Sequence, residues 1–465
     1  MWRLDLVAFV AAIVVVCRLA LEEDLGWVAW VVAGVAVVLL TVTRWPYGAL
    51  TVLVGMSAMS VFFVEIFGWK ARPEHFAAGI VSLAVAVWLL VYKHRIRLEK
   101  LDYWVLAYLA TNYIGSAFGS SAPSATLRWA LLNNLAVLPY FLIRILVQDL
   151  RTLRKAVRIL LGVGIVESAY GILCYASNHV FGTTVGMAMG QYLRDVAAPY
   201  GSLYEPNLFA AYTGCCAVLF LAIYLAQGQR RISSLVCFFI ASLATVLSFS
   251  RAALLALVVA IGWVAWKSGN PLKGRRNRLA VFAVGFALIL MVAILVAATG
   301  VGDVLQERFT NLFQQGLEEE TTITRLLVIR EALQEVPEHP LIGSGTASLQ
   351  LSFDWTKYFA DWTNERAWVG NVVVRILHDT GLLGLTAFLG FLISLWSKTR
   401  RALRRSNPQV PMLIGLSAGA LLYGISFQST EGTMLAFCWV HLGLLASAAI
   451  LMNGPGHNVV MQGEI

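Results

Sequence analysis

A histidine between two prolines, followed by a glycine-flanked turn, stands out from the apolar sequence around it. His339 occupies the polar stretch "EALQEVPEHPLIGSG", residues 331–345. The prolines end a helix, and Gly343 and Gly345 would let the backbone turn closely around a ligand. Histidine titrates near neutrality and can take a proton from a hydroxyl group as a general base. The alternative is a histidine that only caps the C-terminus of a helix.

Arginines are the second group whose chemistry matters. They occur at the ends of apolar runs and in the polar segments between them, for example at Arg72, Arg251, Arg325 and Arg375. A guanidinium stays charged and offers a planar fork of donors that fits phosphate. Several arginines facing one cavity could hold a diphosphate. Together with a histidine base, they fit the transfer of a glycan from a polyprenyl diphosphate to an acceptor hydroxyl.

The same polar segments lack the patterns of metal-dependent and nucleotide-dependent enzymes. They contain no D-x-D, H-x-H or H-E-x-x-H motif, and the acidic run Glu318–Glu320 is contiguous, which is typical of a solvated patch. The chain has no phosphate-binding loop and no dinucleotide fingerprint. We therefore predict metal-independent chemistry without a cofactor.

The composition indicates that these residues are positioned by membrane helices. Of the 465 residues, 59% are hydrophobic and only 13% are charged, whereas a soluble domain carries about a quarter charged residues. The apolar runs have the roughly 20 residues needed to cross a bilayer. We predict an all-α polytopic integral membrane protein with 12–14 transmembrane helices. The candidate spans lie near 4–21, 26–43, 46–66, 75–92, 102–119, 126–148, 154–175, 206–226, 232–249, 251–267, 279–299, 369–396, 410–428 and 432–452.

Basic residues predict how these spans are oriented. Most of the 35 Lys and Arg fall in gaps such as "KHRIRLEK" and "KTRRALRRS", which are cytoplasmic if the N-terminus is cytoplasmic. The net charge of +9 is then an orientation signal with lipid-headgroup contacts, and we expect no nucleic-acid partner. Both termini are predicted to be cytoplasmic, and His339 to lie on the extracytoplasmic face.

The pattern of spans and loops divides the chain into five parts. These are N-terminal transmembrane helices (1–175), an extracytoplasmic loop (176–205), central transmembrane helices (206–299), a large extracytoplasmic catalytic loop (300–368), and C-terminal transmembrane helices with a cytoplasmic tail (369–465). Within the large loop, Leu326, Ile329, Leu333 and Val336 share one helical stripe. This spacing predicts an amphipathic interfacial helix that ends just before His339.

Four motifs, in order, resemble the O-antigen ligase/polymerase superfamily. They are "YGSLYEPNLFAAY" (200–212), "LSFSRAALLAL" (247–257), "REALQEVPEHPLIGSG" preceded by Thr324-Arg325, and "GNVVVRILHDTGLLGL" (370–385). The resemblance covers residues 195–390 and implies a GT-C-like helical bundle in the bacterial cytoplasmic (inner) membrane. Such a protein uses an undecaprenyl-diphosphate-linked glycan, without metal, on the extracytoplasmic face.

The resemblance also implies roles for individual residues. His339 matches the family's essential histidine, and Arg251 and Arg325 match the arginines assigned to the diphosphate. Arg194 and Arg330 are further candidates for diphosphate contacts.

Several candidates and one departure remain around this site. Glu205 could contact the acceptor or pair with an arginine, while Asn207 and Asn371 are expected to hold loops or helix ends. Gly370 stands where the family often has a histidine, and we do not expect His378 to replace it.

The predicted function is transfer of a lipid-linked glycan to an acceptor hydroxyl. The acceptor that we favour is lipid A-core, which makes the chain an O-antigen ligase. Two alternatives of the same superfamily stay open: a polysaccharide (O-antigen or exopolysaccharide) polymerase and a protein O-oligosaccharyltransferase. The expected partners are therefore the lipid-linked donor, membrane lipids and an acceptor that is a glycolipid, a glycan or a protein. A lipid-linked sugar transporter is a more distant alternative, because the charges gather at one face rather than at mid-span.

Overall fold

A computed structural model describes the chain at residues 26–66, 69–93, 96–188, 197–226, 232–268, 320–358, 367–405 and 407–454. Several features of the sequence lie outside these residues: the candidate spans at 4–21 and 279–299, Arg194, and the acidic run Glu318–Glu320 except for its last residue.

The described residues are mostly helical and have only four short strands, which confirms the predicted all-α membrane protein. The helices are α2 (Gly26–Thr43), α3 (Tyr47–Ser57), α4 (Pro73–Tyr92), α5 (Lys100–Phe118), α6 (Pro123–Leu146), α7 (Leu150–Phe181), α8 (Pro206–Ala226), α9 (Ile232–Leu247), α10 (Arg251–Ser268), α13 (Glu320–Glu335), α14 (Leu349–Ser352), α15 (Val372–Leu403), α16 (Val410–Ser426) and α17 (Ala436–Asn453), with the 3-10 turns η2 (Val336–Glu338) and η3 (Trp355–Lys357). Within this described part, 7 helices are long and apolar enough to cross a membrane, and α3, α9 and α16 are shorter apolar helices. The chain is therefore a multi-pass membrane protein.

The candidate span at 46–66 is wrong in its second half. Helix α3 ends at Ser57, and the following residues form a hairpin of β1 (Val64–Ile66) and β2 (Trp69–Ala71), with Val64 opposite Ala71. β-branched and aromatic residues dominate this stretch and favour strands, and the amide of Val61 donates to the carbonyl of Ser202. A second small antiparallel pair joins β3 (Met187–Ala188) to β4 (Ala198–Pro199) within the loop predicted at 176–205.

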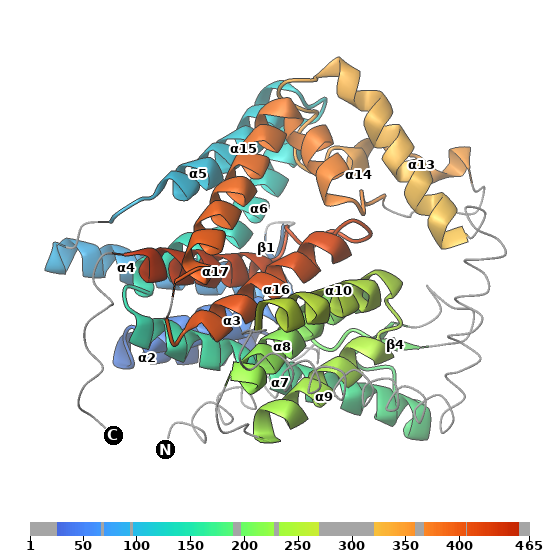
Figure 1. Ribbon diagram of the computed structural model, residues 1–465. Helices are drawn as coiled ribbons and strands as arrows, with labels where there is room; N and C mark the ends of the chain where they lie inside the picture. The colour runs from blue at the N-terminus through green and yellow to red at the C-terminus, as the bar shows by residue number, and fades with distance from the viewer. Residues whose placement is uncertain are drawn as a thin grey trace, which may run out of the picture.

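The helices pack as two neighbouring groups that share one apolar core (Figure 1). In the first group, α15 lies against α5 and α17, and α6 packs against α5 and α17. In the second group, α8 contacts α9, α10 and α16. Helix α13, drawn in gold, lies at the edge of the bundle and contacts α15 (Figure 1).

Helix α15 is not the continuous span that the sequence suggested. It is interrupted at Gly381, whose φ of 62° and ψ of −166° are not helical. An interruption of this kind frees the last carbonyls of one helical segment and the first amides of the next. Those groups need partners within the protein, and the partners come from the loop that carries His339.

The predicted orientation can be tested at two exposed positions, one on each predicted face. In intact cells, a cysteine introduced by Glu338→Cys should react with a membrane-impermeant thiol reagent, whereas one introduced by Arg404→Cys should react only after lysis. The wild-type chain gives the background, since four of its five described cysteines are buried. Labelling of position 404 but not 338 in intact cells would invert the assigned topology.

Candidate active site

The loop after η2 is hydrogen-bonded, backbone to backbone, across the interruption in α15. The amides of Ser344 and Gly345 donate to the carbonyls of His378 (2.8 Å) and Asp379 (3.0 Å). On the other side of the break, the amides of Leu382 and Leu383 donate to the carbonyls of Pro340 (2.9 Å) and Leu341 (3.1 Å). The loop thus satisfies four backbone groups that the break would leave unpaired, and it is held rigidly in return.

Two glycines make this close backbone approach feasible. Gly343 has a φ of +77°, and a Cβ atom there would lie 2.4 Å from the backbone of Asp379 and Thr380. At Gly381, with a φ of +62°, a Cβ atom would lie 2.3 Å from the backbone of Leu341. The close approach that Gly343 allows in the described structure is to the protein's own backbone, and the turn around a ligand stays a prediction.

His339 begins this docked loop. Helix α13 and η2 end directly before it, which confirms the predicted helix end, and its carbonyl accepts a hydrogen bond from the amide of Gly343 (2.8 Å). The residue is half-buried, and its ring forms no hydrogen bond or ion pair with any other residue that the structure describes. A general base needs a ring nitrogen that can accept a proton, and no residue in the described part of the chain bonds to either nitrogen of His339.

A second histidine nearby is fully engaged. His378 has no exposed side-chain surface; its Nε2 lies 2.8 Å from Glu335 Oε2 and its Nδ1 2.9 Å from Asp379 Oδ1. No ring nitrogen is left for a substrate, so His378 does not replace the missing family histidine. Glu335, the last residue of α13, is a partner that sequence analysis overlooked.

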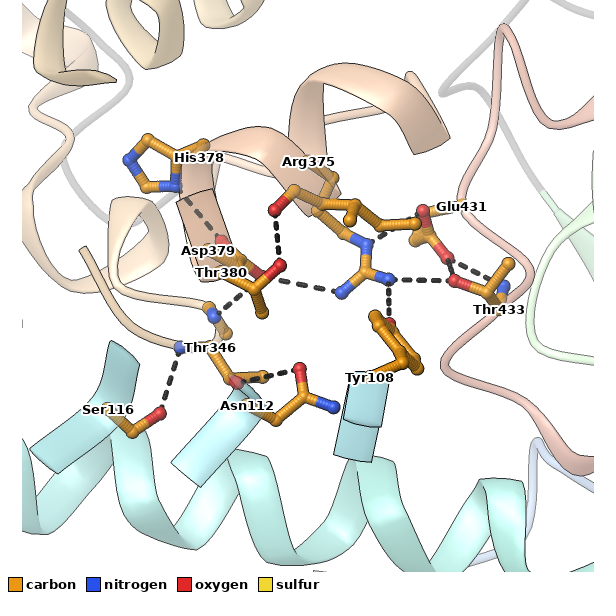
Figure 2. A network of polar contacts seen from close by, with 12 residues as sticks. Tyr108, Asn112, Ser116, Thr346, Arg375, His378, Asp379, Thr380, Glu431 and Thr433 are labelled. Atoms are coloured by element: carbon orange, nitrogen blue, oxygen red, sulfur yellow. Dashed lines mark hydrogen bonds and ion pairs between the residues drawn. The ribbon is translucent and has the colours of Figure 1, made fainter. Parts of the chain in front are cut away.

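Asp379 joins this histidine to the loop and to Arg375 (Figure 2). Its Oδ2 accepts from the amide of Ala347 (3.1 Å) and from Arg375 (3.3 Å). Helix α5 supports the loop from below, because Ser116 Oγ accepts from the amide of Thr346 (3.0 Å) (Figure 2).

Arg375 is a structural residue rather than a diphosphate ligand. Its guanidinium is almost completely buried and lies 2.9 Å from Glu431, with hydrogen bonds to Thr433 (2.7 Å) and the Tyr108 hydroxyl (3.1 Å) (Figure 2). Arg72 is also committed, to Glu74 (3.0 Å) and to the carbonyl of Met434 (2.9 Å). These contacts account for two of the arginines, Arg72 and Arg375, that the sequence offered as possible diphosphate ligands.

The two arginines of α13 lie on different faces of the helix. Arg325 is half-buried and shares the inward-facing side with the buried Val328 and Ala332, whereas Arg330 is exposed. Neither forms an ion pair with another described residue. Arg325 therefore lies on the side of α13 that packs against the protein, and Arg330 does not.

Arg251 belongs to the other group of helices. It is the first residue of α10, which packs against α8 and α16, and it is half-buried.

The remaining candidates hold the loop between α16 and α17. Glu205 accepts hydrogen bonds from Asn207 and from Thr430 (3.1 Å). Asn371 caps α15 by accepting from the amides of Val373 and Val374, both at 3.0 Å, and it also donates to Gln428. Both asparagines thus hold a loop or a helix end in the described structure.

The inner face of α13 packs over a small second core. Val328 and Ala332 join Leu349, Trp355, Ala367 and Val369. The predicted stripe lies on another side, since Leu326 and Leu333 are 43% and 44% exposed. Tyr358 donates to Glu331 of α13 (2.6 Å), and this hydrogen bond to a carboxylate raises the pKa of Tyr358.

Docking of the loop onto α15 can be tested by adding one methyl group. Gly343→Ala should strongly reduce the yield of folded protein, because its Cβ would overlap the backbone at the α15 break. Gly262→Ala in α10 is the matched control, since nothing lies within 4 Å of a Cβ atom there, and it should be tolerated. A Gly343→Ala protein with the yield and thermal stability of wild type would contradict the docked loop.

Comparison with known proteins finds similarity in one region of the chain. A search of curated proteins found no match. Residues 236–389 match the family model of O-antigen ligases. This match covers about a third of the chain, and it includes Arg251, Arg325 and His339.

Proposed function

We propose that the protein transfers a glycan from undecaprenyl diphosphate to an acceptor hydroxyl on the extracytoplasmic face of the bacterial inner membrane. The acceptor that we favour is lipid A-core, which makes the protein an O-antigen ligase. The observation that carries the proposal is the O-antigen ligase match, because it spans His339 and both arginines that the resemblance assigns to the diphosphate. The His339 ring supports it as well, because it lies on a firmly held loop and bonds to no residue in the described ranges.

In the proposed reaction His339 acts as the general base. Its ring accepts the proton of the acceptor hydroxyl as that oxygen bonds to the anomeric carbon of the glycan. The bond from the anomeric carbon to the diphosphate oxygen breaks, and the diphosphate departs on its lipid with the bonding electrons. Arg251 and Arg325, with Arg194 and Arg330 as further candidates, stabilise the charge that develops on the leaving group.

The distance between Arg325 and His339 along α13 determines how long the proposed site must be. Arg325 and His339 are 14 residues apart, and at a helical rise of about 1.5 Å per residue this separation is roughly 21 Å. Glu335, which ends α13 and pairs with His378, lies between them in the chain. A diphosphate with its first sugars is long enough to contact both, so the proposed site is elongated along the helix.

Substitution of His339 tests the chemistry. His339→Ala and His339→Gln should keep the fold and donor affinity of wild type, while turnover of lipid-linked glycan falls by about 10²–10⁴. Arg251→Ala and Arg325→Ala should weaken donor binding as well as turnover, because the diphosphate is present before and during the reaction. Exposed Arg128 on α6 is the control, and Arg128→Ala should change neither.

The outcomes separate the proposed roles. A folded His339→Ala protein with wild-type turnover would leave His339 as the end of a helix and nothing more. Offering purified lipid A-core, a lipid-linked repeat unit and a protein acceptor in parallel identifies which hydroxyl is used. Binding of the donor without transfer to any acceptor would instead favour the transporter.

Metal independence is a separate prediction. Among the described residues, no group of three or more His, Cys, Asp and Glu is placed to hold a metal ion. We expect transfer by the purified protein to continue at the same rate in EDTA, since arginines supply the positive charge. Loss of turnover with chelator, and recovery with a divalent cation, would refute this.

A further inference from the structure

We propose that His378 and Glu335 form an ionic clamp that positions His339, so that both are positioning residues for the transfer reaction. This inference rests on the proposed function of His339. It concerns the place where the C-terminal end of α13 meets α15, one turn before His339 in the chain.

The geometry requires a cation between two carboxylates. Each ring nitrogen of His378 lies within hydrogen-bond distance of a carboxylate oxygen, from Glu335 on one side and Asp379 on the other. Ionised carboxylates only accept hydrogen bonds, so both nitrogens must donate, and only the imidazolium carries a proton on each. His378 is therefore a fixed positive charge rather than a base.

The surrounding charges match this assignment. Asp379 also accepts from Arg375, and Arg375 in turn pairs with Glu431 and contacts the hydroxyls of Tyr108 and Thr433 (Figure 2). A buried charge without a partner costs several kcal/mol, and here each buried charge lies beside one of opposite sign. Asp379 accepts hydrogen bonds from Arg375 of α15 and from the amide of Ala347 in the loop, so its carboxylate is fixed in place beside the His378 ring.

The clamp fixes the chain directly before His339. Glu335 ends α13, and the three residues of η2 follow before His339. On the other side of His339, the carbonyls of Pro340 and Leu341 accept hydrogen bonds from α15. His339 is therefore held from both directions, by a side-chain ion pair before it and by backbone pairing after it.

Loss of the clamp should affect catalysis more than binding. The backbone pairing of the loop stays, but the end of α13 gains freedom to pivot, and the His339 ring moves with it. A misplacement of about 1 Å at a reacting group can lower a rate by roughly 10². We expect Glu335→Ala to lower turnover by about 10–10² while the apparent KM for the donor changes little.

The control is another glutamate of the same helix. Glu331 lies one turn earlier and accepts from Tyr358 rather than from a histidine. Glu331→Ala removes the same charge from α13 but leaves the clamp intact, and its turnover should stay within about twofold of wild type. His378→Gln, which cannot donate from two sites in the same way, should reproduce Glu335→Ala if it folds.

The deciding comparison uses the His339→Ala background. If the clamp acts through His339, Glu335→Ala should lower turnover in the wild-type chain but change the residual turnover of His339→Ala less than twofold. An equal fall in both backgrounds, or no fall in the wild-type background, would overturn the clamp. In the same samples, a spin label at exposed position 334, introduced through Gln334→Cys, should become more mobile when Glu335 is replaced.

Failure of the clamp is distinguishable from failure of the proposed function. If His339→Ala transfers glycan like wild type, the role proposed for His339 is wrong, whatever the clamp does. If His339→Ala is impaired but Glu335→Ala matches Glu331→Ala in turnover and spin-label mobility, only the clamp is wrong.

Discussion

The described site depends on one set of backbone hydrogen bonds, those between the His339 loop and the break in α15. A helix interrupted within a membrane protein must satisfy the freed carbonyls and amides internally, because hydrocarbon offers no partner and each unsatisfied group costs several kcal/mol. Here the loop supplies four partners, two on each side of Gly381. Since the same bonds fix the loop, the break and the placement of His339 are one structural feature.

The polar residues around this junction fall into two groups. Some pair with one another and stabilise the junction, and others have no charged partner among the described residues. Arg375, Asp379, His378 and Glu431 neutralise one another in the interior, and Glu335 extends the network to the end of α13. His339, Arg325 and Arg330 have no such partners in the described part of the chain. A chemically open histidine on a firmly supported loop is the arrangement expected of a catalytic group.

Much of the fold was predictable because hydrophobic length and charge distribution specify membrane helices directly. The end of the helix before His339 followed from proline chemistry in the same way, but the stripe that its periodicity selected is not the packed face, since Leu326 and Leu333 are exposed. The break at Gly381 could not be predicted in this way, because "LHDTGLLGL" is apolar enough to belong to one continuous span. The residues that pair with the broken helix lie about 40 positions earlier in the chain, in the His339 loop. Likewise, nothing local separates the buried Arg375 from the half-buried Arg325; only the long-range partners Tyr108 and Glu431 make Arg375 structural.

The central claim is that His339 and the arginines assigned to the diphosphate serve one donor. The most direct measurement is an experimental structure of the protein in a lipid nanodisc with a bound undecaprenyl-diphosphate-linked glycan. Our account predicts the diphosphate within hydrogen-bond distance of Arg251 or Arg325, and the anomeric carbon beside the His339 ring with room for an acceptor hydroxyl between them. A diphosphate bound where neither arginine can reach it, or a glycan whose anomeric carbon lies away from His339, would contradict the account.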